Sequence, residues 1–176
     1  WRQEVEAAGL DFVSADQYQV FPPPASGSPG AGEAAVALMP LLDEFRPDVV
    51  VNDILTVAPA LAAEACGCSW GTLIPHIYPV QDSGRPFFAV GALPARTGLG
   101  RGFWRATEKA LKWGLERGRD DLNAQRALIG LPATDRFHGG TSPDLAMVTT
   151  YPHLEYPRLW PPSVHVTGPM PFETPH

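Results

Sequence analysis

The pattern of hydrophobic and polar positions predicts alternating strands and helices. A β-branched run at residues 49–51 is followed by helical spacing over residues 54–65 and by an apolar run at residues 69–74. A strand, a helix and a second strand within about 30 residues is typical of a βαβ unit. Such a unit implies parallel strands that are buried on both faces and joined by a right-handed crossover. The sequence therefore predicts an α/β fold with a mostly parallel sheet.

The same reasoning predicts further elements on both sides of this unit. Helices are expected at residues 1–8, 33–45, 103–117 and 120–129, and strands at residues 10–14, 145–149 and 163–167. Pro40 falls inside one of these helices, where a proline kinks or splits a helix. Two segments rich in proline and glycine, residues 21–32 and 81–102, are predicted to be mobile surface loops.

Length and composition limit the domain organisation. The 176 residues, 44% of them hydrophobic and 18% charged, suffice for a single domain with a sizeable core. The first eight residues resemble the last turns of a helix, and residues 169–176 resemble the start of an interdomain linker. We therefore expect one domain over residues 1–176, incomplete at its N-terminus, with a second domain of the protein absent.

Charge and cysteine content exclude several classes of partner. A net charge of −6 leaves no basic face for nucleic acid. No window approaches the 18 or so apolar residues that span a bilayer, and no secretory signal begins the chain, so no membrane partner and a cytoplasmic location are expected. Cys66 and Cys68 are too close for an unstrained disulfide and lack further ligands nearby. Two reduced thiols, and neither a metal nor a cofactor, are predicted.

Polar residues follow two of the predicted strands. Asp53 comes shortly after residues 49–51, and His76 follows residues 69–74. In an open parallel sheet, ligands bind outside these strand ends, and neighbouring strands bring both loops to one edge. Asp53 fits either a catalytic carboxylate or the N-cap of the next helix. His76 fits either an acid–base group or a hydrogen-bonded loop histidine. The residues alone thus predict a ligand-binding edge without a complete catalytic set.

Three stretches carry a family resemblance. They are RPDVVVNDILTVAPALAAEACGCSWGTLIP at residues 46–75, DDLNAQRALIGLP at 120–132 and PDLAMVTTYPHLEYPRLWPPSVHVTGPMPFE at 143–173. In this order they resemble the acceptor side of the family 1 glycosyltransferases of the GT-B fold, in particular the bacterial branch that decorates macrolides and other natural products. The resemblance implies a Rossmann-like, three-layer domain that forms the N-terminal half of a GT-B fold and lacks its first strands.

The resemblance also implies an inverting transfer of a sugar from a nucleotide-sugar to a hydroxyl of a small apolar aglycone. In that family a base, often a histidine paired with an aspartate, removes the hydroxyl proton, and no metal is generally needed. Asp53 matches the aspartate. The base and the donor-binding domain have no counterpart in this sequence, so this chain alone is expected to transfer no sugar. The nucleotide-sugar would be a co-substrate held by the absent domain.

The acceptor contacts implied by the resemblance lie after the second strand. The candidates are histidine and aromatic residues: His76, Tyr78, Phe87, Phe88, Phe103 and Trp104. Phe103 and Trp104 fit equally well as core or interdomain packing. The two loops rich in proline and glycine are expected to act as lids over the acceptor, and a homodimer is compatible with the sequence.

Two other hypotheses stay open. One is a non-catalytic α/β module that binds a small molecule or activates a partner transferase. The other is a different enzyme on the same architecture, such as a sugar-nucleotide epimerase, which the three stretches disfavour.

Overall fold

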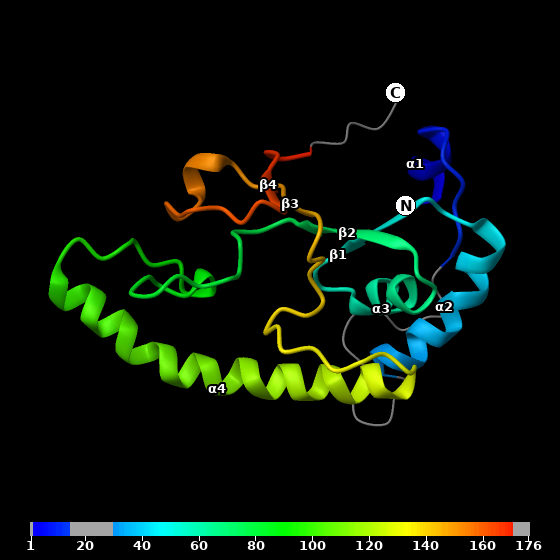
Figure 1. Cartoon of the computed structure of the whole chain (residues 1–176). Coiled ribbons are helices and arrows are strands. Elements are labelled where there is room, and N and C mark those ends of the chain that lie inside the picture. Colours follow the sequence, from blue (N-terminus) through cyan, green and yellow to red (C-terminus); the bar gives the residue numbers. More distant parts are fainter. Residues whose placement is uncertain (1, 15–29, 171–176) are drawn as a thin grey trace.

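A computed structural model describes residues 2–14 and 30–170 of the chain (Figure 1). Within this part, four strands form one sheet in the order β1-β2-β3-β4. The strands are β1 (Val49–Asp53), β2 (Ser69–Ile74), β3 (Ala146–Val148) and β4 (Val164–Val166). Every neighbouring pair is parallel. The prediction of an α/β fold with a parallel sheet is confirmed, and the arrangement is consistent with a Rossmann-like fold.

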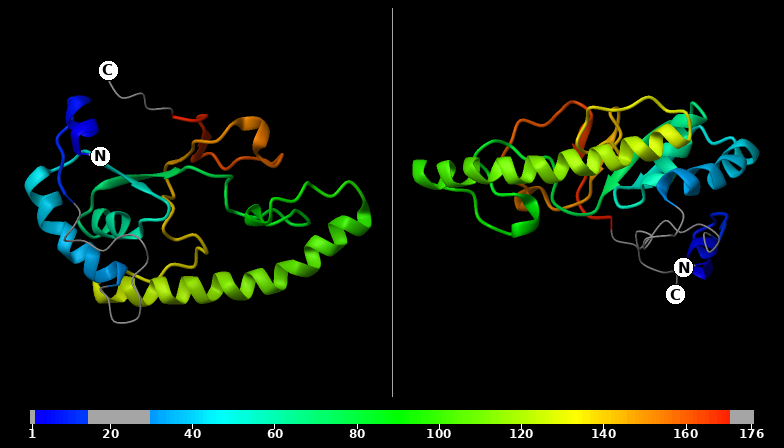
Figure 2. Two further views of the ribbon diagram at one scale, coloured as in Figure 1. Left: turned by 180° about the vertical axis from the view of Figure 1, so that it is seen from behind. Right: turned by 90° about the horizontal axis from the view of Figure 1, so that it is seen from below.

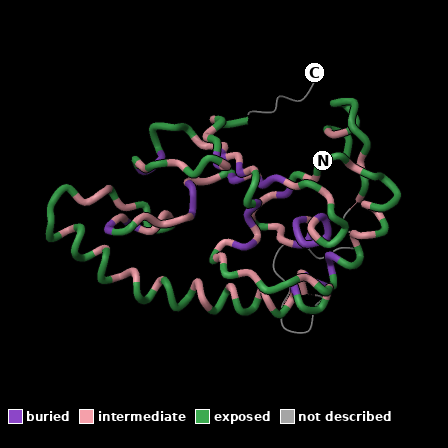
Figure 3. Tube along the Cα trace, viewed as in Figure 1, coloured by how far each residue is buried: buried purple, intermediate pink, exposed green. Residues whose placement is uncertain are grey.

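In this part of the chain the helices are α1 (Arg2–Ala7), α2 (Ala31–Phe45), α3 (Val57–Ala65) and α4 (Gly98–Leu128), with short 3-10 turns η1 (Phe88–Val90) and η2 (Pro152–Leu154). Of the helices, α3 lies against the first two strands, and α4 runs along one side of the described part (Figures 1 and 2). Helix α3 packs on β1 and β2, and α2 packs on α3 and α4. Alanines fill the inner surface of α3, so the helix approaches the strands closely. Figure 3 shows the buried residues gathered on α3 and the central strands.

The core has two parts. The first joins α2 and α3 through buried small and apolar side chains: Ala34, Ala35, Ala58, Leu61 and Ala62. The second follows the sheet from β2 to β4, with the buried residues Ile74, Tyr78, Ala146, Val148 and Val164. This second cluster includes Ile74 and Val148, the last residues of β2 and β3, and Tyr78 of the loop after β2, so it helps to fix that loop.

The expectation that β1 is buried on both faces is wrong. Val49 and Val51 are about half exposed, whereas Asn52 is buried. Strand β1 stands at one end of the sheet order, and α3 covers one of its faces. Among the described residues, no helix forms a second layer over Val49 and Val51, so the three-layer arrangement stays a prediction.

Several predicted element boundaries differ from the structure. Residues 10–14 form no strand, and none of the strands in the described part of the chain pairs with them. Helix α2 continues through Pro40 without ending. The two helices expected at residues 103–117 and 120–129 are one helix, α4, of 31 residues. Gly118 lies inside α4, since an exposed glycine costs a helix only about 0.5–1 kcal/mol. The predicted loop at residues 21–32 falls largely outside the described residues, and its last residues begin α2.

Two further expectations concern the cysteines and membrane-spanning helices. Cys66 and Cys68 are free thiols, as predicted, and Cys66 caps the carboxyl end of α3. None of the helices in residues 2–14 and 30–170 combines the length and apolar character needed to cross a bilayer.

Candidate functional site

The carboxyl ends of the four strands define one edge of the sheet. Asp53 is the last residue of β1 and pairs with Leu73 of β2, and His76 follows two residues after the end of β2. Because the strands are parallel, the loops that follow them leave the sheet on the same side. The expectation that β1 and β2 end together is confirmed. Ligands of open parallel sheets bind at this edge, so we take it as the candidate site.

Asp53 is held by the turn that follows β1. Its carboxylate oxygen Oδ1 accepts a hydrogen bond from the backbone N–H of Leu55 at 2.7 Å. Its backbone carbonyl accepts bonds from the N–H and the hydroxyl of Thr56. Helix α3 begins only at Val57, so Asp53 is not the N-cap of that helix. Within the described residues, the second oxygen, Oδ2, has no hydrogen-bond partner and stays available to another group.

His76 is oriented by one hydrogen bond and one stacking contact. Its Nδ1 lies 2.8 Å from the carbonyl oxygen of Ile77. Since a carbonyl only accepts, Nδ1 carries the proton in the neutral ring, and Nε2 is left as an acceptor. The imidazole stacks on the ring of Phe88 with centroids 5.0 Å apart and planes at 13°. Phe87 contacts Phe88 edge-on at 4.6 Å. The structure thus brings together three of the predicted acceptor contacts.

Tyr78 belongs to the core of this edge. Its side chain is 6% exposed and contacts Trp160 at 5.5 Å between ring centroids. The Arg158 guanidinium lies over both rings. Burial raises the pKa of Tyr78, and the positive charge of Arg158 opposes that rise. Tyr78 therefore has little surface to offer a ligand, although it borders the groove described below.

Phe103 and Trp104 form a separate pair on α4. Their rings meet at 73° with centroids 5.1 Å apart. Phe103 is largely exposed, so it is not a core residue of the described part. Within residues 2–14 and 30–170, no ring contact joins this pair to the rings of His76 and Phe88. Their role as acceptor contacts stays a prediction.

Sequence reasoning missed a third group at this edge, in the loop after β3. The buried carboxylate of Glu155 accepts hydrogen bonds from the Tyr78 N–H at 3.2 and 3.3 Å and from the Thr150 hydroxyl at 2.6 Å. Arg158 donates to the Val80 carbonyl at 2.6 Å. These bonds fasten the loop after β2 to the loop after β3. The position of Thr150 after a third predicted strand was the available signal, because that strand also ends at the candidate edge.

Two adjoining grooves lie next to this network. One, of about 330 Å³, is bordered by Tyr78, and the other, of about 460 Å³, lies against α4. They share the lining residues Val80, Phe137 and His138. Both volumes fall in the range of small-molecule pockets, roughly 300–1,000 Å³. Apolar atoms make up most of their accessible surface, and the groove against α4 is also lined by five charged side chains: Asp82, Arg105, Glu108, Lys109 and Lys112.

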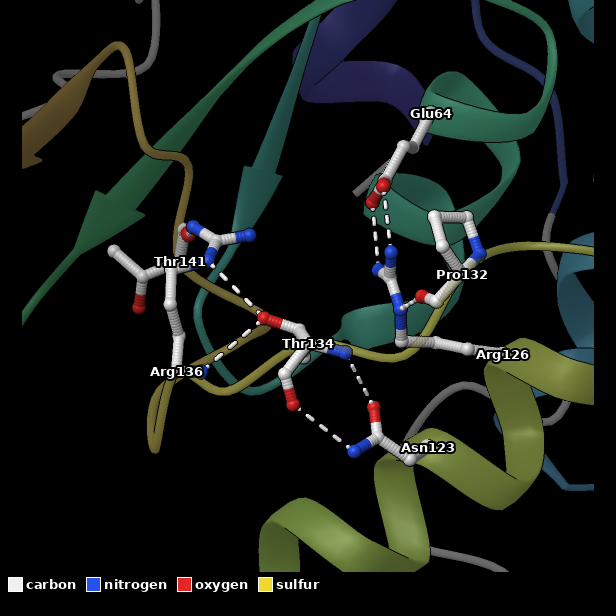
Figure 4. A network of polar contacts seen from close by, with 7 residues as sticks. All are labelled: Glu64, Asn123, Arg126, Pro132, Thr134, Arg136 and Thr141. Carbon is white, nitrogen blue, oxygen red and sulfur yellow. Dashed lines mark hydrogen bonds and ion pairs between the residues drawn. The ribbon is translucent and has the colours of Figure 1, made fainter.

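The predicted motif at residues 120–132 has a structural role (Figure 4). Arg126, 3% exposed, donates two hydrogen bonds of 2.7 Å to the Glu64 carboxylate of α3 and a third to the Pro132 carbonyl. The Asn123 side chain exchanges two hydrogen bonds with the backbone of Thr134. The hydrogen bond from Arg126 is the main reason that the pKa of Glu64 lies below its usual value. The motif holds the loop after α4 against α3.

Acidification is expected to destabilise the protein in two steps. Burial lowers the pKa of His138, so protonation favours the unfolded chain as the pH falls below the ordinary histidine value of 6.5. The lowered pKa of Glu64 gives stability that is present above pH 4.5 and is lost as the pH falls through the folded-state value. Urea unfolding across pH 3–7 measures both. His138→Gln should remove the first decline and Glu64→Gln the second, and an unchanged profile in both variants would contradict this origin.

No group of three or more histidine, cysteine, aspartate or glutamate side chains in the described part of the chain is arranged to hold a metal ion. The site as described is a set of oriented polar groups beside aromatic rings, with two grooves along the loop after β2.

The fold and the edge define the class of this protein as an α/β protein with a parallel sheet and a candidate ligand site at its carboxyl edge. Comparison of the sequence with protein-family models and with curated proteins gives no match.

Proposed function

We propose that this chain is the acceptor-binding side of an inverting glycosyltransferase of the GT-B type. The transferase would move a sugar from a nucleotide-sugar to a hydroxyl of a small apolar aglycone. One observation carries the proposal: Asp53 ends β1 at the carboxyl edge of the sheet with Oδ1 fixed by Leu55 and Oδ2 available. This arrangement suits a carboxylate that must orient a neighbouring base.

The proposed chemistry assigns Asp53 the role of partner to a histidine base supplied by a part of the protein outside this chain. A carboxylate that accepts a hydrogen bond from an imidazole selects its tautomer and stabilises the imidazolium formed on proton transfer. The base takes the proton from the acceptor hydroxyl, whose oxygen forms a bond to C1 of the sugar. The bond from C1 to the diphosphate breaks, and the nucleoside diphosphate leaves with the electron pair.

The acceptor would lie against the stacked rings of His76 and Phe88. These rings give a flat apolar surface, and Nε2 of His76 is free to accept a hydrogen bond from an acceptor hydroxyl. The grooves of about 330 and 460 Å³, which Tyr78 and Val80 of the same loop help to line, would provide room for the apolar body of an aglycone. Small-molecule sites usually combine apolar surface with a few polar groups that orient the ligand.

A second candidate function is a non-catalytic module that binds the same class of small molecule. The two grooves favour it, since binding alone needs no base and no donor. The two functions differ in one result, because only the transferase forms a glycosidic bond when the complete gene product receives a nucleotide-sugar.

Replacing Phe88 by alanine is expected to weaken aglycone binding up to about tenfold, since an aromatic contact contributes about 0.5–1.5 kcal/mol. The measurement is isothermal titration of the protein with a flavonoid aglycone and with a macrolide aglycone. Phe45→Ala is the matched control, because Phe45 is exposed at the end of α2, ahead of β1. Equal affinities for wild type and Phe88→Ala would contradict the proposed acceptor surface.

A further inference from the structure

Two adjoining grooves lie between the loop after β2 and the N-terminal half of α4, which run alongside each other (Figures 1 and 2). The larger is the groove of about 460 Å³ described above. The smaller, of about 230 Å³, is lined by Ser83, Gly84, Arg85, Pro94, Ala95 and Arg101. Ser83 lines both. The Gly84 N–H donates to Glu108 at 2.7 Å, and the Gln81 amide donates to the Arg85 carbonyl at 2.8 Å. These bonds hold the loop, so the walls of both grooves are formed before a ligand binds.

Basic side chains outnumber acidic ones along these grooves. Among the residues that the structure describes, the linings hold five basic side chains and two acidic ones: Arg85, Arg101, Arg105, Lys109, Lys112, Asp82 and Glu108. The chain as a whole has a net charge of −6, so the charge along the grooves is opposite in sign to that of the chain. A cleft lined mainly by one sign of charge attracts ligands of the other sign.

Both acidic side chains are engaged with the loop that forms the wall. The buried Oδ2 of Asp82 lies 3.6 Å from Nε of Arg85 and 3.8 Å from Nε of Arg158. Oε1 of Glu108 accepts the hydrogen bond from the Gly84 N–H. Because these contacts serve to position the loop, the two carboxylates do not favour a cationic ligand.

Arg105 and Lys109 are the basic side chains of the larger groove that remain for a ligand. Both are exposed, and neither forms an ion pair within residues 2–14 and 30–170. Lys112, in contrast, lies 3.7 Å from the Glu116 carboxylate. A Cβ added at Gly84 would lie 3.5 Å from Nε of Arg105, so the Arg105 side chain lies against the loop and not on the outer side of α4. These two positive charges therefore face the groove without a partner of opposite charge.

Apolar side chains of the same groove lie next to these cations. Leu111 and Leu115 are half-buried on α4, and Phe137 also lines the groove. From Lys109 to Leu115 the helix rises by about 9 Å. A ligand that contacts both the basic and the apolar side chains therefore needs a negative group at one end of an apolar body of about this length.

We propose that the groove between α4 and the loop after β2 binds an acidic aglycone, an apolar molecule with a carboxylate or phosphate group that Arg105 and Lys109 hold. A guanidinium forms two parallel hydrogen bonds to such a group, and an ammonium adds a point charge. The apolar body would lie on Leu111 and Leu115. The inference rests on the proposed function for the role of this ligand as the acceptor, whereas its charge preference is measured without any sugar transfer.

Isothermal titration of the complete gene product with matched acidic and neutral probes tests the proposal. At neutral pH, a hydroxynaphthoate should bind about tenfold more tightly than its methyl ester, and added salt should reduce this difference. A hydroxynaphthyl phosphate is the third probe. Tighter binding of the phosphate than of the carboxylate would identify a phosphate as the recognised group, and weaker binding would identify a carboxylate.

Substitutions in the groove locate the charge preference. Arg105→Gln and Lys109→Gln should each weaken binding of the hydroxynaphthoate about threefold, and together about tenfold, while binding of the ester stays unchanged. Arg117→Gln is the matched control, because Arg117 is an exposed arginine on α4 that lines neither groove. Circular dichroism establishes that each variant is folded.

The outcomes separate this inference from the proposed function. Equal affinities for acid and ester, or equal losses in Arg117→Gln and Lys109→Gln, would overturn the acidic aglycone and leave the transferase intact. Glycoside formation by a protein that binds neither naphthalene probe would also overturn it. Binding of the acid that depends on Arg105 and Lys109, with no glycoside formed, would support the charged groove and contradict the transferase alone.

Discussion

Replacing Asp53 by asparagine is expected to lower kcat for sugar transfer by about 10²–10⁴-fold in the complete gene product, with little change in KM, because proton transfer by an oriented base contributes about that much. An asparagine Oδ1 still accepts the hydrogen bond from Leu55, so the turn after β1 is kept. What is lost is the negative charge and the free oxygen Oδ2. Steady-state kinetics with a nucleotide-sugar and a saturating aglycone measure the effect.

The control for this substitution is Asp48→Asn. Asp48 is exposed and directly precedes β1. Its substitution therefore makes the same chemical change at the opposite edge of the sheet. It should leave kcat unchanged. If both Asp53→Asn and Asp48→Asn kept the wild-type kcat, the catalytic role would be contradicted, and Asp53 would only order the turn after β1.

Replacing Arg126 by methionine is expected to lower the free energy of unfolding by about 3–5 kcal/mol, the usual result of removing one partner of a buried ion pair. Arg126 is almost fully buried, and its loss would leave the Glu64 carboxylate and the Pro132 carbonyl without their donor. Urea unfolding at neutral pH gives the value. The adjoining loop, which Asn123 and Thr134 hold, should become more sensitive to proteolysis.

An exposed ion pair on the same helix provides the comparison. Lys112 and Glu116 lie 3.7 Å apart and are both solvent-exposed. Lys112→Met should change the free energy of unfolding by only about 0–1 kcal/mol. The double variant Glu64→Leu with Arg126→Met should recover much of the stability lost in the single variant, since no unpaired charge is left. Equal losses for Lys112→Met and Arg126→Met would contradict the role given to burial.

The part of the fold that could be predicted from the sequence is the part with local signals. The β-branched run of β1, the alanine-rich helix α3 and the apolar run of β2 follow one another with short connections, so their parallel pairing was foreseeable. The continuity of α4 was not foreseeable, because Gly118 resembles the end of a helix. Its cost to helix stability, about 0.5–1 kcal/mol, is small enough for a long helix to tolerate. The exposure of one face of β1 depends on which elements pack around the strand, and the sequence of the strand itself does not indicate these neighbours.

The candidate site likewise has features that could be predicted from the sequence and features that could not. The location of Asp53 at the carboxyl edge follows from the parallel strands alone. His76 stacks on Phe88, 12 positions away, and the Tyr78 N–H bonds to Glu155, 77 positions away. Both contacts depend on the way in which the long loops fold back onto the sheet edge. Glu155 was overlooked because an isolated glutamate in a proline-rich loop resembles an ordinary surface residue. Its burial becomes visible only with the loop after β2 in place.

The most direct test of the proposed function is one transfer assay. The complete gene product that contains this chain is incubated with a panel of nucleotide-sugars and hydroxylated apolar aglycones, and products are analysed by mass spectrometry and by NMR of the anomeric centre. We expect an aglycone glycoside whose anomeric configuration is inverted relative to the donor. Aglycone binding with no glycoside formed from any donor would contradict the transferase and would leave the small-molecule-binding module.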